Sequence, residues 1–208
     1  MKTTVITGDD LSYAVKVILS GGLVAVPTDT IYGLAGNGLD ADAVAKIYEV
    51  KGRPAIKPLI LLVPDLRVAE TVCANIPESA QLLAKAFWPG ALTLVLPRRD
   101  TVPDIVAAGG DTIGVRCPDH PKTLEFLRLA GVPAAAPSAN ISDMPSPRSA
   151  QDVLAYFDGK IDCVIDGGPC KIGVESTIVS LAAAPYKILR HGAIPEEDIR
   201  NALAQHQP

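Results

Sequence analysis

Apolar residues along the chain follow two spacings, one typical of helices and one typical of buried strands. The helical spacing is clear in residues 11–18 and again around residues 44–48. Asp9 or Asp10 can cap the first of these helices, and Gly21 can end it. The pattern predicts helices at residues 11–20, 40–52, 77–87, 121–131 and 194–205, and one more that begins near Ser149.

Short apolar runs between these segments predict strands. Residues 59–63, LILLV, form a continuous run of branched side chains, which a strand covered on both faces requires. The pattern predicts strands at residues 23–27, 59–63, 91–97, 112–118, 132–137, 163–166, 176–181 and 186–190. Helices and strands alternate early and strands cluster late, so we expect an α/β fold with a twisted mixed sheet flanked by helices, formed by one domain over residues 1–208.

Composition excludes several classes of protein. Apolar residues make up 48% and charged residues 20% of the chain, and the formal net charge is −4, which is typical of a globular protein and argues against one that coats nucleic acid. The N-terminal residues lack the apolar segment of a signal peptide, and no apolar run could span a bilayer. We therefore expect a cytoplasmic protein that makes no contact with a membrane.

Cysteine and histidine usage gives no sign of disulfides or of a metal centre. The four cysteines show no C-x-x-C spacing, so we expect reduced and mostly buried thiols. The three histidines are too scattered for a ready-made zinc site. No resident metal is expected. Trp88 is expected to pack against the core, and Asp166 to belong to a turn.

Basic residues stand beside turns and strand ends, where side chains can point into a shared crevice. They are Lys51, Arg53, Lys57, Arg116 and Arg190. Each alone could be a solvated surface cation, but the first three fall within seven positions that also hold a proline and a glycine. Holding three positive charges together is unfavourable unless an anion binds. The set therefore predicts a site for phosphate or carboxylate groups.

A second set of candidates carries hydroxyl and amide groups. The loop PTDTIYG follows the predicted strand at 23–27, and the segments SAN (138–140) and GVEST (173–177) flank later strands. Ser138 and Asn140 could instead cap a helix. The chain has neither a phosphate-binding G-x-x-x-x-G-K-S/T loop nor a G-x-G-x-x-G segment after a strand. Because no G-x-S-x-G elbow is present, a serine hydrolase site is not expected.

Seven separated blocks, from about Gly21 to about Ile194, resemble the YrdC family in both their sequences and their order along the chain. They read PTDTIYGL, KGRPAIKPL, WPGALTLVL, TIGVRCPDHP, APSANIS, ESTIVSL and ILRHGAI. The resemblance implies an enzyme that joins L-threonine, bicarbonate and ATP into threonylcarbamoyl-adenylate and pyrophosphate, the first step of a tRNA modification. It also implies the YrdC-like fold, Mg²⁺ arriving with ATP, and a contact with tRNA or with a tRNA-modification complex.

The same resemblance assigns roles to individual residues. Threonine contacts are implied for Thr30, Arg116, Ser138 and Ser176. ATP contacts are implied for Lys51, Arg53, Lys57, Thr112, Asn140, Arg148 and Arg190, and Lys51 and Arg53 are also the expected catalytic residues. The loop ISDMPSP departs from a more usual glycine-containing version, which leaves the roles of Ser146 and Arg148 open.

Two other functions fit parts of the same pattern. A basic hollow could follow an RNA backbone without any catalysis, although the net acidity and the scarcity of aromatic residues argue against that. The PTDTIYG and SAN blocks would also suit a carbamoyl-adenylate-forming enzyme that uses carbamoyl phosphate.

Overall fold

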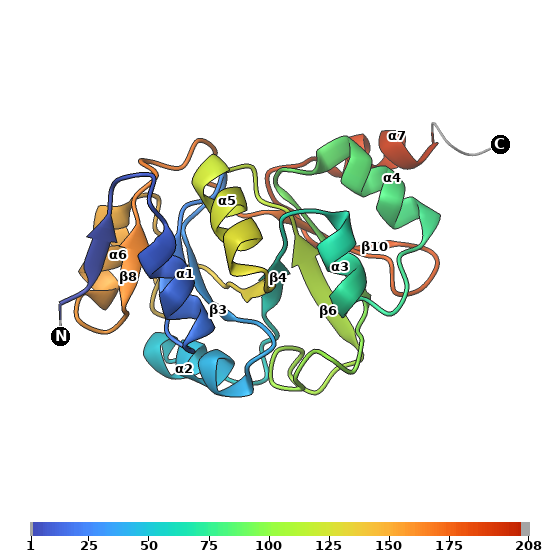
Figure 1. The fold of residues 1–208 in the computed structure, drawn as a ribbon. Coiled ribbons are helices and arrows are strands. Elements are labelled where there is room, and N and C mark those ends of the chain that lie inside the picture. Colours follow the sequence, from blue (N-terminus) through green and yellow to red (C-terminus); the bar gives the residue numbers. More distant parts are fainter. Residues whose placement is uncertain (1, 205–208) are drawn as a thin grey trace.

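Ten strands join into one mixed sheet in the computed structural model, which describes residues 2–204 (Figure 1). Their order across the sheet is β1-β8-β2-β3-β7-β4-β6-β5-β9-β10, with both parallel and antiparallel neighbours. The strands are β1 Thr4–Ile6, β2 Val24–Val26, β3 Gly33–Asn37, β4 Ile60–Leu62, β5 Leu92–Pro97, β6 Thr112–Arg116, β7 Ala134–Ala135, β8 Cys163–Ile165, β9 Thr177–Ser180 and β10 Lys187–Arg190. The expected mixed α/β fold is confirmed.

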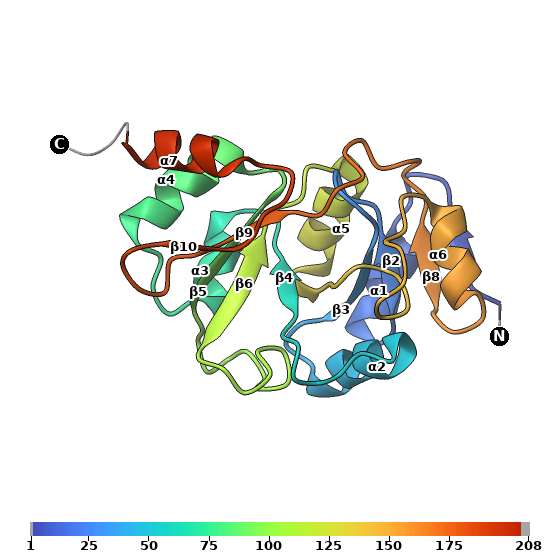
Figure 2. The same cartoon turned by 180° about the vertical axis from the view of Figure 1, so that it is seen from behind.

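Helices cover both faces of this sheet. They are α1 Ser12–Leu19, α2 Ala41–Lys51, α3 Leu66–Val72, α4 Glu78–Phe87, α5 Pro121–Ala130, α6 Ala150–Phe157 and α7 Glu196–Ala204. The helices α1 and α5 lie in front of the sheet in Figure 1, whereas α6 lies in front of it in Figure 2. No helix within residues 2–204 combines the length and the apolar character needed to cross a bilayer.

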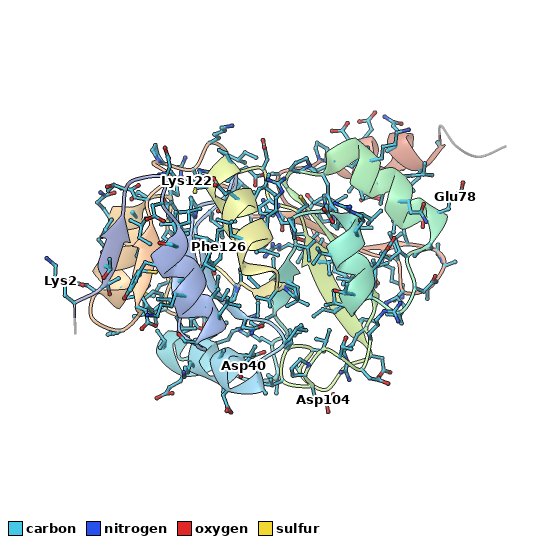
Figure 3. All side chains as sticks on the ribbon, in the orientation of Figure 1. Lys2, Asp40, Glu78, Asp104, Lys122 and Phe126 are labelled. Atoms are coloured by element: carbon cyan, nitrogen blue, oxygen red, sulfur yellow. The ribbon has the colours of Figure 1, made fainter. Side chains whose placement is uncertain are left out.

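Alternation along the strands separates the core into two clusters of buried residues. In the segment 23–26, Leu23 and Ala25 pack into the cluster that includes α2 and α6, while Val24 and Val26 pack against α1 and α5. Phe126 of α5, labelled in Figure 3, is fully buried in the second cluster. A strand buried on both faces is continuously apolar, as the sequence at this point is.

Most predicted elements are present, and three were missed. The strand β1, the strand β3 and the helix α3 had no counterpart in the prediction. The predicted start of the first helix is corrected: α1 begins at Ser12, and Asp10 only accepts a hydrogen bond from the Ser12 amide at 2.9 Å. Residue 205, the end of the last predicted helix, lies outside the described residues.

Local signals at α2 explain how one basic side chain reaches the interior. The Asp40 side chain accepts hydrogen bonds from the Asp42 and Ala43 amides, and Gly52 ends the helix in the left-handed conformation. Asp40 and Gly52 are the ends of the range 40–52 that the sequence predicts for this helix. The last helical residue is therefore Lys51, whose side chain is directed inward and is only 1% exposed.

The cysteines and Trp88 behave as predicted. All four cysteines are free and buried, and burial raises the pKa of Cys73 and Cys163 to about 12. The ring of Trp88 packs against the core, and its indole nitrogen donates to the Leu92 carbonyl at 2.8 Å. Asp166 accepts a hydrogen bond from the Gly168 amide, as expected for a turn.

Candidate functional site

Two adjoining cavities lie where the loop after β2 meets the ends of β6 and β10. The first has a volume of about 180 Å³ and is lined by parts of residues 28–33, 58–62, 136–138 and 175–178, together with Arg53, Arg116 and Arg190. The second, of about 210 Å³, is lined by Lys51, Arg53, Lys57, Ser138, Asn140, Ser142, Asp143, Met144, Ser146 and Glu175. Arg53, Ser138 and Glu175 belong to both, so the cavities share a wall.

The loop after β2 is folded around a threonine hydroxyl. Thr28 Oγ1 accepts hydrogen bonds from the amides of Thr30 and Ile31, at 3.1 and 3.2 Å. It also lies 2.9 Å from Thr30 Oγ1. A hydroxyl that closes a tight turn in this way replaces the backbone ladder that ends with the strand. The turn presents the buried Thr30 to the first cavity.

Arg116, at the end of β6, is fixed by three protein groups. Its Nε donates to the Gly90 carbonyl at 2.9 Å, its Nη1 to Thr30 Oγ1 at 2.8 Å, and its Nη2 to Asp29 Oδ1 at 2.6 Å. Both members of the ion pair with Asp29 have side chains only 4% exposed. Burial lowers the pKa of Arg116, and Asp29 opposes that shift. A guanidinium has five N–H donors, so two are left for a ligand.

Lys51 reaches from α2 to the loop after β7. Its ammonium donates to the carbonyls of Ser138 and Asn140, both at 2.5 Å, and lies 3.4 Å from Asn140 Oδ1. Burial, together with the charge of Arg53, lowers its pKa to about 8, and Glu175 opposes this shift. The Asn140 side-chain amide in turn donates to the Met144 carbonyl at 2.5 Å. Lys51 therefore shapes the wall of the second cavity while lining it.

Two further cations belong to the exposed turn after α2. Arg53 donates through Nε to the Lys57 carbonyl at 3.2 Å and through Nη2 to the Pro58 carbonyl at 3.0 Å. These bonds fold its guanidinium back over the turn, toward the shared wall. Lys57 lies 3.6 Å from Asp143, and both of these side chains are largely exposed. Lys57 is therefore able to leave Asp143 for a stronger anion.

Arg190 and Ser176 complete the first cavity. Arg190 donates through Nε to the Ser176 carbonyl at 3.0 Å, through Nη2 to Ser176 Oγ at 3.0 Å, and through Nη1 to Glu175 Oε2 at 2.5 Å. Ser176 Oγ also lies 2.8 Å from Thr93 Oγ1 on β5, and that pair is buried. Each polar group at this end of the cavity thus has a fixed orientation.

The structure brings most of the predicted site residues together, with two exceptions. Thr112 begins β6 and lines neither cavity, because Arg116 occupies the cavity at the other end of the same strand, four residues away. Arg148 is exposed and also lines neither cavity; its guanidinium lies over Gly173 instead. Of the two residues left open in the 141–148 loop, Ser146 lines the second cavity.

Four polar residues near the cavities were either given an alternative role or missed in the sequence analysis. Ser138 and Asn140 do not cap a helix, because α6 begins with Ser149 as its N-cap. Asp29 and Glu175 were missed by the sequence analysis, although each lies next to a predicted residue. The clue for Asp29 was its position inside the PTDT turn, where an acid stands beside the threonine that Arg116 contacts.

No group of three or more histidine, cysteine, aspartate or glutamate side chains within residues 2–204 is arranged to hold a metal ion. The acids at the two cavities are Asp143 and Glu175, against five basic residues. A lining with this excess of positive charge does not favour a cation bound by protein groups alone.

Comparison with known families decides the relationship of the chain. The family model Sua5/YciO/YrdC, described as "Telomere recombination", matches residues 16–192. The chain belongs to this family. That membership confirms the resemblance drawn from the seven sequence blocks.

Individual relatives of this Sua5/YciO/YrdC protein point the same way. It is 50% identical to the threonylcarbamoyl-AMP synthase of Pyrococcus abyssi (strain GE5 / Orsay) over 90% of this chain and 55% of that protein. It is 46% identical to the threonylcarbamoyl-AMP synthase of Bacillus subtilis (strain 168) over 93% of this chain and 56% of that protein. The chain thus spans about half the length of these two curated relatives.

A solved structure gives the same fold. The crystal structure of P. abyssi Sua5 complexed with L-threonine superimposes with a TM-score of 0.94 at 46% identity, covering 97% of this chain and 61% of that one. The relative therefore shares the strand and helix arrangement that forms the two cavities here.

Proposed function

We propose that this chain forms threonylcarbamoyl-AMP and pyrophosphate from L-threonine, bicarbonate and ATP. The observation that carries the proposal is the pair of adjoining cavities, one lined by arginines and hydroxyls and the other by lysines and an amide. A reaction that joins an amino acid to a nucleotide needs two such sites in contact. The names of the relatives and the L-threonine bound to one of them support this assignment.

The first cavity suits threonine. Its volume of about 180 Å³ is below the roughly 300–1,000 Å³ of sites for drug-sized ligands, so a small molecule fits it best. Arg116 supplies a planar guanidinium for a carboxylate, held in place by Asp29. Hydroxyl groups of Thr30 and Ser176 are within the same lining and can pair with the polar groups of the amino acid.

The second cavity suits the phosphates of ATP. Lys51, Arg53 and Lys57 line it, and Arg53 also reaches the shared wall, where the two substrates would meet. Arg190 stands on the other side of that wall, beside Glu175. Magnesium ions commonly accompany ATP and neutralise phosphate charge. The protein offers no metal cage among the described residues, so Mg²⁺ would be held by the phosphates, and the steps below do not depend on it.

In the proposed reaction the threonine amine condenses with bicarbonate to an N-carboxylate: the C–N bond forms, a C–O bond of bicarbonate breaks, and the oxygen leaves as water with the proton of the amine. An oxygen of this group attacks the α-phosphorus of ATP, a new P–O bond forms, and the bond to pyrophosphate breaks. Negative charge grows on the leaving oxygens, so the step needs positioning and fixed positive charge rather than a covalent nucleophile. Arg53, Arg190 and Lys51 supply that charge from three separate parts of the chain.

The test is to follow pyrophosphate release with ATP, L-threonine and bicarbonate, and to omit each in turn. Release should require all three. Arg53→Ala should lower kcat by about 10²–10³, the effect of removing one preorganised donor. Arg67→Ala is the matched control, because Arg67 pairs only with neighbouring Asp65 and its side chain is 89% exposed. Release that continues without threonine, or an Arg53 variant with near-normal rates, would contradict the proposal.

The same assay separates the alternatives. A carbamoyl-adenylate-forming enzyme of the other type would require carbamoyl phosphate in place of threonine and bicarbonate. An RNA-binding module would instead bind RNA with an affinity that falls steeply with salt and ignores ATP and threonine. Contact with tRNA or a modification complex and a cytoplasmic location remain predictions, and neither is needed for the proposed chemistry.

A further inference from the structure

Glu175 is an acid at the centre of a site lined mainly by bases. It is one of three residues that line both cavities, with Arg53 and Ser138. The basic residues of the two linings are Lys51, Arg53, Lys57, Arg116 and Arg190. A carboxylate in a site for phosphates repels the ligand, so its presence there requires a physical reason.

The contacts of Glu175 give that reason. One carboxylate oxygen accepts from Arg190 Nη1 at 2.5 Å, and the other lies 3.4 Å from Ser146 Oγ. The same negative charge opposes the lowering of the pKa of Lys51 and of Arg53 that burial causes. Glu175 therefore acts on three cations that come from α2, from the turn after it and from β10.

The backbone that carries Glu175 is closely held. Its carbonyl accepts from the Ala193 amide at 3.0 Å. A Cβ placed on Gly192 would lie 2.4 Å from the Glu175 carbonyl oxygen and 2.5 Å from the Ser176 carbonyl carbon, so the two segments are in direct backbone contact. These contacts hold the main chain in place. Only the Glu175 side chain, about half-exposed, is free to rotate.

We propose that Glu175 is the built-in counter-anion of the site: it pairs with Arg190 while the site is empty, and the polyphosphate of the nucleotide displaces it. This inference rests on the proposed function, because it names the ligand group as polyphosphate. The carboxylate keeps the cations oriented and partly neutralised without ligand, at the expense of affinity for the phosphates. It also competes with bound pyrophosphate and so favours its release.

The test compares Glu175→Gln, which keeps the side chain's size and removes its charge, with the unchanged protein. Inorganic tripolyphosphate is the probe, and its binding is measured by calorimetry without Mg²⁺ at one fixed salt concentration. The variant should bind about tenfold more tightly, which equals about 1.4 kcal/mol. Inorganic pyrophosphate should show the same direction, and as a product it should inhibit the variant more strongly.

Glu78→Gln is the matched control. Glu78 begins α4 and is exposed, and Figure 3 labels it at the edge of the molecule, so its substitution should leave tripolyphosphate affinity unchanged. If Glu175→Gln does not fold by circular dichroism, Glu175→Ala is measured in its place and the same increase is expected.

Equal or weaker binding by the Glu175 variant overturns the inference, as does the absence of binding by both proteins. Weaker binding would mean that the carboxylate promotes phosphate binding, either by orienting Arg190 or through a bound cation. The calorimetric comparison needs no turnover. It therefore fails or succeeds separately from the proposed function, which fails if the unchanged protein releases no threonine-dependent pyrophosphate.

Discussion

Asp29→Asn tests whether the buried ion pair fixes the arginine of the first cavity. The substitution keeps the shape of the side chain and removes the charge that faces Arg116 at 2.6 Å. Asp29 Oδ1 also accepts from the Asp119 amide at 3.1 Å. Since both side chains of the pair are only 4% exposed, the variant leaves a buried guanidinium without its counterion.

The expected cost follows from burial. Removing one partner of a buried pair destabilises a protein by about 3–5 kcal/mol. For a chain of this length each kcal/mol shifts Tm by about 2–4 °C, so Tm should fall by about 6–20 °C. Glu196→Gln is the control, because Glu196 pairs with Arg200 at 3.5 Å on the surface, with both side chains well exposed. An exposed pair of that kind contributes about 0.3–0.5 kcal/mol.

A second variant separates stability from function. Asp29→Asn combined with Arg116→Met removes both charges, so that no uncompensated ion is left buried. The double variant should therefore recover much of the lost Tm yet fail to bind threonine. Thermal unfolding and threonine calorimetry measure the two effects. Asp29→Asn with unchanged stability and unchanged threonine affinity would refute the claim that Asp29 holds Arg116 in position.

Two further predictions concern Lys51 and Thr93. The Lys51 pKa of about 8 lies below the usual lysine pKa of 10.5, so the folded protein binds fewer protons than the unfolded chain between these values. Stability should therefore rise with pH across that window in urea titrations, by about 3 kcal/mol at most, and Lys51→Met should lack the rise. Turnover should fall above pH 8 as the ammonium is lost. Thr93→Val removes the partner of Ser176 Oγ and should raise the threonine KM several-fold without changing the ATP KM.

The predicted fold was accurate where a single segment carries its own signal. The run LILLV and the capped helix α2 are examples, since their apolar spacing and end residues are local. The strand β1 has only three residues and is defined by its pairing with β8, about 160 positions later. No local sequence pattern indicates that pairing. The strand β3 contains two glycines and was missed because glycine disfavours strands.

Packing explains why β3 forms despite its sequence. A Cβ on Gly36 would lie 3.2 Å from both Ile47 and Leu23. The absence of a side chain at this position therefore lets β3 pack closely against these two residues. The helix α3 was more accessible to prediction. Asp65 stands three residues before Val68 and accepts from its amide at 3.1 Å, which is the standard signal of a helix start.

The candidate site was predictable in its cations and less so in its acids. Basic residues beside strand ends already suggest a binding site for an anion. A search for positive charge finds Arg116 and Arg190 but does not select Glu175. An acid among bases has meaning only once the distances are known: Glu175 lies 2.5 Å from Arg190, though 15 positions separate them. Asp29 was overlooked for the same reason, since its partner stands 87 positions away.

The wall shared by the two cavities depends on the buried ammonium of Lys51. Ser138 lines both cavities, and its carbonyl is held at 2.5 Å by the buried ammonium of Lys51. The same ammonium holds the Asn140 carbonyl, so one charge from the end of α2 fixes the segment between the two cavities. Without that charge, two carbonyls would lose their donor in a buried setting and the segment would have to rearrange. Lys51 therefore affects the first cavity through the backbone that it positions, although it lines only the second cavity.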